Sequence, residues 1–377
     1  MPPTSTIWRL EDHTVGKHRV LRRYLEAWLP IMLSSNERVL FIDAFAGPGE
    51  YSGGEKGSPV IALEAFLSHS NLHSMTGGIS FVFIEKESPR AQHLEQVIGR
   101  FQGKLPARSQ VKVLQGSFTN ELPYALDAID LQNATQAPAF VMVDPFGVSD
   151  TPMSLIGRIL ANPKSEVYIS FMYDYVNRFK KSPEFSDPLD ELFGCREWRD
   201  GINKEDAEQR KSFFYGLYKE QLRAAGAKYV LHFDLYQKQR LKYALFFATS
   251  HPRGCDKMKQ AMWKVAPFGN FQFRSGLKDQ LILGQEFVDL SPLRRDLLDE
   301  FGRDQCVAIE DIGLFMSSDK TAFHTGHHKQ VLRDMENDGE LAVEQGTRVR
   351  QGTFPDGTRL RFVEKPEPPP QQRSFAI

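Results

Sequence analysis

Residues 39–51 restrict the possible fold more than any other stretch of this chain of 377 residues. Residues 39–43 form a short apolar run ending on Asp43, which is typical of a central strand buried on both faces of a parallel sheet. The chain then breaks into small residues at Ala46, Gly47 and Gly49. Glycines allow the backbone to approach a ligand closely, and a strand-end carboxylate can accept hydrogen bonds from hydroxyl or amino groups. The stretch therefore predicts a nucleotide-type binding loop, although an ordinary strand-to-helix turn could have the same residues.

Two motifs of phosphate-binding loops can be compared with the same residues. A Walker A loop beginning at Gly49 needs a lysine after Gly54, where Glu55 stands. The dinucleotide pattern beginning at Gly47 needs a third glycine where Ser52 stands. Both patterns fail, and the neutral loop that remains is typical of sites for S-adenosylmethionine.

Further apolar runs at residues 80–84, 111–115 and 139–143 alternate with helical patterns. This alternation predicts a parallel sheet with helices on both faces, so that the strand ends meet at one ligand-binding edge. The residues that follow these three runs are of the types found in binding sites, namely Glu85, Ser117 with Phe118, and Asp144. Glu85 is placed where such sheets bind a ribose, although a strand-end charge without a role is the alternative.

The length and the 41% hydrophobic content predict two folded units. Residues 1–285 are expected to form the α/β unit, with an irregular insertion at about 180–205. Residues 228–235 and 241–249 are separated by a short joint, which predicts an antiparallel hairpin at the edge of the sheet.

Residues 14–33 carry apolar side chains at helical spacing and predict an amphipathic helix ahead of the first strand. A solvated polar face is the favoured interpretation of its basic residues, and a substrate entrance is the alternative. These residues are Lys17, His18, Arg19, Arg22 and Arg23.

Residues 286–365 show three helical patterns followed by two strands around a turn rich in glycine and proline, which predicts a winged-helix domain. Residues 366–377 are rich in proline and poor in apolar side chains, so we expect a disordered tail.

The composition excludes some classes of protein. With 47 basic and 48 acidic residues, no overall field attracts nucleic acid or membrane, so any such binding needs a local patch. Cys195, Cys255 and Cys306 are far apart and fit neither a metal motif nor a disulfide framework. We find no apolar run long enough to span a membrane, and we expect a cytoplasmic protein without a metal site.

Several motifs together resemble the three-Cys-motif partner proteins (TcmP), within or related to the class I methyltransferases that use S-adenosylmethionine. The stretches that carry the resemblance are residues 41–49, 83–86, 143–147, 171–174 and 352–358. The resemblance implies a Rossmann-like methyltransferase fold and a companion protein carrying a three-Cys motif.

By the wider methyltransferase resemblance, S-adenosylmethionine is the cofactor and several residues gain expected roles. Its methionine end would be surrounded by Asp43, Phe45, Ala46, Gly47 and Gly49. Glu85 would bind the ribose, and Ser117 and Phe118 would flank the adenine. The stretch Asp144-Pro145-Phe146-Gly147 is similar to the Asp-Pro-Pro-Tyr motif of adenine amino-methyltransferases. Since this chain has Phe146 and Gly147 at the last two positions, Phe146 or Tyr173 would supply the stacking ring.

These inferences lead to two competing functions. The favoured one is methyl transfer to an amine of a nucleic acid, and the alternative is a non-catalytic scaffold whose winged helix binds a companion protein. Residues 290–365 contain 11 basic and 14 acidic residues, a net charge of −3, which is unusual for a dedicated DNA reader. The residues expected to bind nucleic acid are His327, Lys329 and Arg333 on the third helix and Arg359 and Arg361 on the second strand.

Overall fold

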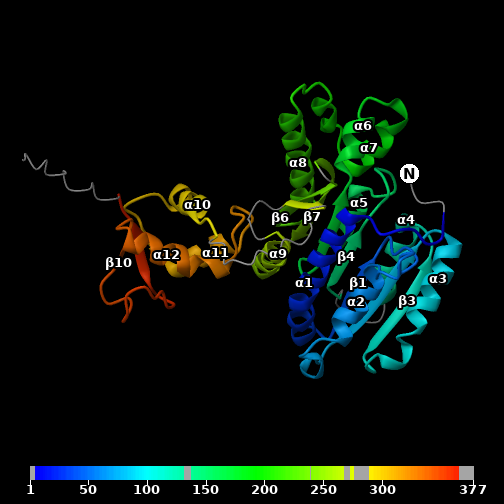
Figure 1. The fold of residues 1–377 in the computed structure, drawn as a ribbon, viewed down its shortest axis with the longest axis horizontal. Coiled ribbons are helices and arrows are strands. Elements are labelled where there is room, and N and C mark those ends of the chain that lie inside the picture. The colour runs from blue at the N-terminus through cyan, green and yellow to red at the C-terminus, as the bar shows by residue number, and fades with distance from the viewer. Residues whose placement is uncertain (1–4, 131–136, 238, 267–271, 276–287, 365–377) are drawn as a thin grey trace, which may run out of the picture. The chain divides into compact units, whose positions relative to one another are not determined.

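The computed structural model describes residues 5–130, 137–237, 239–266, 272–275 and 288–364. The chain divides into two compact units, Met1–Gln285 and Glu286–Ile377 (Figure 1). The expected domain boundary at residue 285 and the expected tail at 366–377 lie outside the described residues.

The described part of the first unit is built on an eight-stranded sheet in the order β3-β2-β1-β4-β5-β7-β6-β8. Strands β1 to β5 are parallel, and β7 is antiparallel to both β5 and β6. The strands are β1 (Arg38–Asp43), β2 (Gly78–Glu85), β3 (Ser109–Gln115), β4 (Ala139–Val143), β5 (Glu166–Phe171), β6 (Tyr229–Gln237), β7 (Arg240–Thr249) and β8 (Gln272–Ser275). This mostly parallel α/β sheet is consistent with the expected Rossmann-like methyltransferase fold.

One detail of the expected sheet is wrong. The hairpin β6–β7 is antiparallel, as predicted, but it does not form the edge, because β8 pairs with β6 on its outer side. The four-residue strand β8 is too short to show a strand pattern in the sequence.

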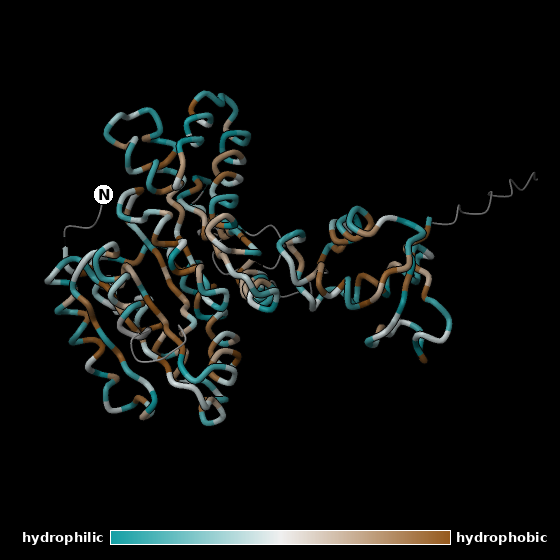
Figure 2. Tube along the Cα trace, turned by 180° about the vertical axis from the view of Figure 1, so that it is seen from behind, coloured by the Kyte–Doolittle hydropathy of each residue, from teal (hydrophilic) through white to brown (hydrophobic). Residues whose placement is uncertain are grey.

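Helices cover both faces of the sheet (Figure 1). One face packs against α1 (Asp12–Ser35), α2 (Ser58–Leu67), α3 (Ser88–Gly99) and α9 (Pro252–Val265). The other face packs against α4 (Phe118–Asp130), α5 (Met153–Leu160), α7 (Ser186–Phe193) and α8 (Ala207–Ala224). In β1, Val39 and Phe41 enter the first core, while Leu40 and Ile42 enter the second, which explains its uninterrupted apolar sequence. Figure 2 shows hydrophobic residues along these central strands.

The strand order reverses at β1, since the chain passes from β1 to β2 and β3 on one side and returns to β4 and β5 on the other. In open sheets of this kind, ligands bind outside the carboxyl ends of the strands at the point of reversal. The ends of β1 and β4 lie side by side at this point.

The insertion at about 180–205 is not irregular, because it contains α7 and two 3-10 turns, Pro183–Phe185 and Glu197–Gly201. Helix α6 (Tyr173–Phe179) leads into it from β5. Phe179 and Phe185 stack with ring centroids 4.2 Å apart, which holds the first turn of the insertion against α6.

The second unit has the element order α10 (Ser291–Phe301), β9 (Cys306–Ala308), α11 (Ile309–Met316), α12 (His328–Asn337), β10 (Leu341–Val343) and β11 (Arg359–Phe362). Its described strands form a sheet in the order β10-β11-β9, with both pairs antiparallel. The core contains Leu297, Ile312, Leu332 and Phe362. The three predicted helices and two predicted strands are present, together with the unpredicted β9, and the winged-helix assignment stays a prediction.

No helix among the described residues combines the length and the apolar character needed to cross a membrane.

Candidate functional site at the carboxyl edge of the sheet

The loop after β1 has a backbone that only glycine adopts readily. Gly47 and Gly49 have φ values of 61° and 85°. A Cβ on Gly49 would lie 2.8 Å from Leu94 Cδ1, so the loop also packs too closely on α3 for a larger residue. The Ala46 amide donates to the Ile84 carbonyl at 2.9 Å, and the Gly57 amide donates to the Gly49 carbonyl at 2.8 Å. The loop is thereby held in one conformation at the edge of the sheet.

Two adjoining cavities open beside this loop, with volumes of about 350 Å³ and about 270 Å³. Both are within or near the size range of small-molecule sites. Phe45, Pro145, Phe146 and Tyr175 line both cavities and form the boundary between them. The larger one is called here the first cavity and the smaller one the second cavity.

The second cavity brings together Glu85, Ser117 and Phe118, as the sequence predicted. Glu85 is buried, and its Oε1 accepts a hydrogen bond from the Glu87 amide at 2.8 Å. Burial raises the pKa of its carboxyl. Phe185 of the insertion adds a further ring to the lining. A cavity lined in part by aromatic rings, with a buried carboxylate in its wall, suits a planar base joined to a sugar hydroxyl.

Asp43 is placed differently from the expectation, since it lines neither cavity. It is fully buried beneath the loop, where its Oδ1 accepts a hydrogen bond from the Phe45 amide at 3.2 Å. Burial raises the pKa of Asp43 to about 7. Asp43 therefore shapes the loop from below. Of the residues predicted to surround the methionine end, Phe45, Ala46, Gly47 and Gly49 do line the first cavity.

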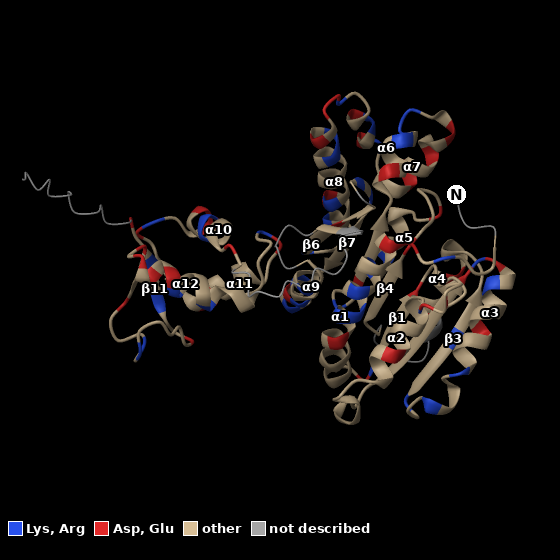
Figure 3. Cartoon of the chain, in the orientation of Figure 1, with Lys and Arg blue, Asp and Glu red and all other residues tan. Residues whose placement is uncertain are grey.

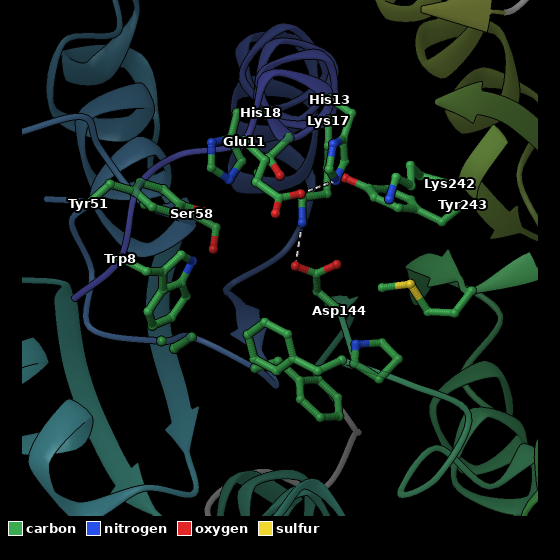
Figure 4. A pocket seen from close by; sticks show the side chains of 18 of the residues that line it. Trp8, Glu11, His13, Lys17, His18, Tyr51, Ser58, Asp144, Lys242 and Tyr243 are labelled. Carbon is green, nitrogen blue, oxygen red and sulfur yellow. Dashed lines mark hydrogen bonds and ion pairs between the residues drawn. The ribbon is translucent and has the colours of Figure 1, made fainter. Parts of the chain in front are cut away.

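An ion pair between Lys17 of α1 and Asp144 at the end of β4 lies in the first cavity (Figure 4). Lys17 is only 3% exposed, and its Nζ donates a short hydrogen bond to Asp144 Oδ2. Burial alone would raise the pKa of Asp144, but the Lys17 ammonium outweighs it and the pKa is lowered. Asp144 is thus held as a carboxylate.

The second carboxylate oxygen, Asp144 Oδ1, is buried and makes no hydrogen bond of normal geometry among the described residues. The Ser170 hydroxyl, which is also buried and unpaired there, lies close enough to contribute to the lowered pKa of Asp144. Buried polar atoms in native proteins are nearly always paired, so an unpaired one beside a cavity points to a ligand. His13 Nδ1 and the Tyr243 hydroxyl, which belong to residues lining the same cavity, are also buried and unpaired within the described part of the chain.

We expected the basic residues of α1 to form a solvated face, and this expectation is wrong for two of them. Lys17 and His18 are buried and line the first cavity, while Arg19 and Arg23 are exposed. Burial lowers the pKa of His18 to about 3, with the Lys17 charge acting in the same direction, so its imidazole is neutral. The first turns of α1 lie over the carboxyl edge of the sheet, and sequence periodicity does not show where along a helix its polar face becomes covered.

Trp8 lies in the same cavity and was not predicted. Its ring contacts Phe146 and Tyr51 edge-on, with centroid separations of 5.9 Å and 6.0 Å. The Ser52 amide donates to the Trp8 carbonyl at 2.9 Å, which ties the segment before α1 to the loop after β1. Figure 4 shows Trp8, Tyr51 and Ser58 on one side of the ion pair and Tyr243 on the other. A tryptophan ahead of the first helix gives no sequence signal of such a contact.

Tyr173, expected to supply a stacking ring, lines neither cavity. Its ring is buried and packs edge-on against Tyr215 with a centroid separation of 5.7 Å. Met172, the residue before α6, and Tyr175 in the first turn of α6 line the first cavity instead. The chain turns into a helix directly after β5, so the position facing the site follows helical and not strand spacing.

The basic residues expected to bind nucleic acid lie on two different faces of the second unit. Lys329 and Arg333 are exposed on α12, and Arg333 Nε donates to the Gly352 carbonyl at 3.4 Å. Arg359 and Arg361 alternate along β11 with Leu360 and Phe362, which are buried. Phe362 stacks on Phe301 of α10, so the two arginines are on the sheet face turned away from the helices.

The remaining predicted residue, His327, stands beside α12 and belongs to its N-terminal turn, where the His324 amide donates to its Nδ1 at 3.4 Å. Figure 3 shows basic and acidic residues interspersed over this unit. Arg359 is paired with Glu344 at 3.3 Å. Among the described residues of the whole chain, no group of three His, Cys, Asp or Glu side chains is placed to hold a metal ion.

No family model matches this chain, and no curated protein matches it. Among solved structures, it is similar to the MTase domain of METTL16, with 13% identity and a TM-score of 0.29 over 60% of this chain and 66% of that domain. It is also similar to precorrin-6y C5,15-methyltransferase from Geobacter metallireducens GS-15, with 10% identity and a TM-score of 0.30 over 60% of this chain and 87% of the other. A human methyltransferase 10 domain containing protein gives 12% identity and a TM-score of 0.29 over 61% and 82% of the two chains.

These solved structures are methyltransferases by name. Identities and TM-scores this low assign no function to this chain.

Proposed function

We propose that this protein is an S-adenosylmethionine-dependent methyltransferase that acts on an amine of a nucleic acid. The observation that carries the proposal is the Asp144 carboxylate, which is held charged by Lys17 and has one buried oxygen unpaired among the described residues. It lies in a cavity that adjoins a second, partly aromatic one. An amine acceptor has the N–H groups that such an oxygen lacks.

The residues of the second cavity suit the adenosine part of the cofactor. The Glu85 carboxylate is an acceptor for ribose hydroxyls, and Ser117 and Phe118 suit the adenine. Gly47 and Gly49, which line the first cavity without a side chain, suit the methionine part. When bound there, the cofactor would supply an electrophilic methyl group on a sulfonium.

The chain's own contribution to the reaction is orientation. Asp144 would hold the acceptor amine, and Phe146, which is 40% exposed, would stack on a ring that carries it. Transfer between a sulfonium and an amine depends mainly on proximity and alignment, so a rigid carboxylate and an aromatic wall supply what the step requires.

Cofactor binding tests the first half of this proposal. Calorimetry on the full chain should show binding of S-adenosylmethionine, and Glu85→Ala should weaken it by about tenfold or more, because it removes a hydrogen bond to a charged group. Glu95→Ala, at an exposed position of the neighbouring helix α3, is the matched control and should bind normally. A folded wild-type protein that does not bind the cofactor would refute the proposed function.

We further propose that the second unit is a winged helix whose α12 contacts nucleic acid. The exposed Lys329 and Arg333 support this, since residues four apart share a helix face. Replacing both with alanine should weaken binding to single- or double-stranded nucleic acid and make the salt dependence shallower, by about one unit for each phosphate that the variant no longer binds. The double variant Arg359→Ala with Arg361→Ala changes the other face. Its nucleic-acid affinity shows whether that face contributes to binding as well. Unchanged affinity and salt slope in the α12 variant would favour a protein-contact surface.

A non-catalytic scaffold remains the second candidate, and two exposed apolar side chains favour it. Leu314 of α11 is 61% exposed, and Val349, between β10 and β11, is fully exposed. Such side chains suit contact with a companion protein, for which a partner carrying a three-Cys motif is our proposal. A scaffold would transfer no label from a cofactor with a tritiated methyl group to mixed DNA, RNA and protein acceptors.

A further inference from the structure

The ion pair in the first cavity leaves a donor and an acceptor unused side by side. Lys17 Nζ can donate three hydrogen bonds, and Asp144 is its one hydrogen-bond partner within the described residues. Asp144 uses Oδ2 for this bond, while its Oδ1 is buried and unpaired there. The cavity of about 350 Å³ lies directly against both groups.

The walls around this pair restrict the shape of a ligand. Trp8 and Phe146 are in edge-on contact with each other, and Tyr51 continues the same aromatic wall. The Lys17 ammonium is 5.6 Å from the centroid of the Tyr243 ring on the opposite side. A flat ring lying against the aromatic wall would present its edge to Lys17 and Asp144, which is the manner in which a single extruded base is read.

We propose that Lys17 is a specificity-determining residue that, together with Asp144, selects a heterocyclic base in which the acceptor amine stands next to an unprotonated ring nitrogen. The amine donates to Asp144 Oδ1, and the ring nitrogen accepts from Lys17 Nζ. Adenine and cytosine have this edge. On its Watson–Crick edge guanine presents an N–H beside its amine, so a donor would face the Lys17 ammonium, and its unprotonated N3 lies on the sugar side. Uracil and thymine have no exocyclic amine.

This inference rests on the proposed methyl transfer and refines its substrate class. In the transfer, the amine nitrogen forms a bond to the methyl carbon as the carbon–sulfur bond breaks toward sulfur. The surplus proton of the methylated amine passes to Asp144 Oδ1 and then to water. Lys17 touches the ring nitrogen and not the reacting nitrogen, so its effect should be on the choice of base.

The experiment compares acceptors that differ in one ring atom. The full-length protein is given a cofactor with a tritiated methyl group and short single strands of thymine or uracil that carry one adenine, one cytosine, one 1-deazaadenine or one guanine, in deoxyribose and ribose forms. Wild-type protein should methylate adenine faster than 1-deazaadenine by about tenfold or more, because the analogue lacks the acceptor for a charged donor. Guanine should receive no label, and the sugar that supports transfer distinguishes DNA from RNA.

The variant Lys17→Met separates specificity from structure. It should lower the rate with adenine to that with 1-deazaadenine, so that the ratio falls to about one, whereas structural damage would lower both rates and keep the ratio. Lys17→Arg should restore part of the preference, and Arg23→Met on the exposed face of the same helix should behave as wild type.

The inference is overturned if wild-type protein treats adenine and 1-deazaadenine alike, if Lys17→Met keeps the preference, or if protein that binds the cofactor labels neither adenine nor cytosine. Failure to bind the cofactor at all would instead contradict the proposed function, and calorimetry distinguishes the two results.

Discussion

Helix α1 contacts two carboxylates on neighbouring strands, and the two differ in every property that matters for function. Lys17 reaches Asp144 at the carboxyl end of β4, and Tyr24 reaches Glu166 at the beginning of β5. Lys17 and Tyr24 are seven residues apart, about two helical turns, and therefore share a face of α1. One face of α1 therefore contacts a carboxylate at each of the two ends of the parallel strands.

The two carboxylates differ first in charge. Asp144 has a cation as its partner, which lowers its pKa against the effect of burial. Glu166 accepts from two neutral hydroxyls, Tyr24 Oη at 2.6 Å and Thr249 Oγ1 at 2.9 Å. Hydroxyls offset burial only in part, so the pKa of Glu166 is raised to about 7.

They differ also in whether the protein satisfies them. Glu166 has a donor on each oxygen, although it too borders a cavity, of about 200 Å³. Asp144 leaves Oδ1 unpaired among the described residues. A cavity beside a buried carboxylate is therefore not enough to indicate a site. An unpaired oxygen alone is not enough either, since Asp43 Oδ2 is buried and unpaired among the described residues but Asp43 lines neither cavity. Asp144 combines an unpaired oxygen with a position in a cavity wall.

The largest expected effect comes from breaking the ion pair. Lys17→Met should lower the free energy of unfolding by about 3 kcal/mol, because it removes one partner and leaves the Asp144 charge largely desolvated. The Asp144 side chain is 22% exposed, which places the effect at the lower end of the range for buried pairs. Urea denaturation near neutral pH measures the difference.

The double variant Lys17→Met with Asp144→Leu is the matched control. It should recover most of the stability that the single variant loses, since two apolar side chains replace the pair. It should not methylate adenine, because it lacks the Asp144 carboxylate. Equal stability of the single variant and the wild-type protein would show that Asp144 does not depend on Lys17 for its charge.

A smaller effect is expected at Glu166, as a change in stability with pH. The folded protein keeps this carboxyl protonated up to about pH 7, well above the ordinary pKa of glutamate. At pH values between the ordinary pKa and about 7, the native state therefore binds more protons than the unfolded state. Its contribution to stability should therefore fall as pH rises. Relative to Glu166→Gln, which cannot ionise, wild-type protein should lose about 2 kcal/mol between about pH 5.5 and about pH 7.5.

Denaturation at several pH values measures this difference, and subtraction of the two proteins removes the contributions of other titrating groups. Glu95→Gln, at an exposed position, should give curves parallel to those of the wild type. If the free energy of unfolding of Glu166→Gln changes with pH in parallel with that of the wild type, the contrast between the two carboxylates does not hold.

The strands and the loop of the first unit could be predicted because the sequence patterns that indicate them are local. The apolar run before Asp43 and the glycines after it set a buried strand and a tight loop, and both are present. The strand ends at Glu85 and Asp144 lie at one edge because parallel strands bring their carboxyl ends together. Strand β8, in contrast, is held by pairing with β6 and has no pattern of its own.

Several residues that line the first cavity could not be predicted, because their contacts join distant parts of the sequence. The contact between Lys17 and Asp144 joins positions 127 residues apart, and nothing near Lys17 in the chain distinguishes it from the exposed Arg23. Trp8 and Tyr243 likewise become lining residues only through packing. Tyr175 lines the cavities and Tyr173 does not, because the strand-to-helix change after β5 alters which position faces them.

The sequence by itself determined the alternation of strands and helices, the edge at which polar residues gather, and the glycine loop, since each follows from spacing and side-chain type along the chain. Only the tertiary structure decided which turns of α1 are covered, which carboxylate receives a cation, and which oxygen is left without a partner. Charge and hydrogen-bond satisfaction depend on groups brought together from distant parts of the chain, and so they exist only once the chain has folded.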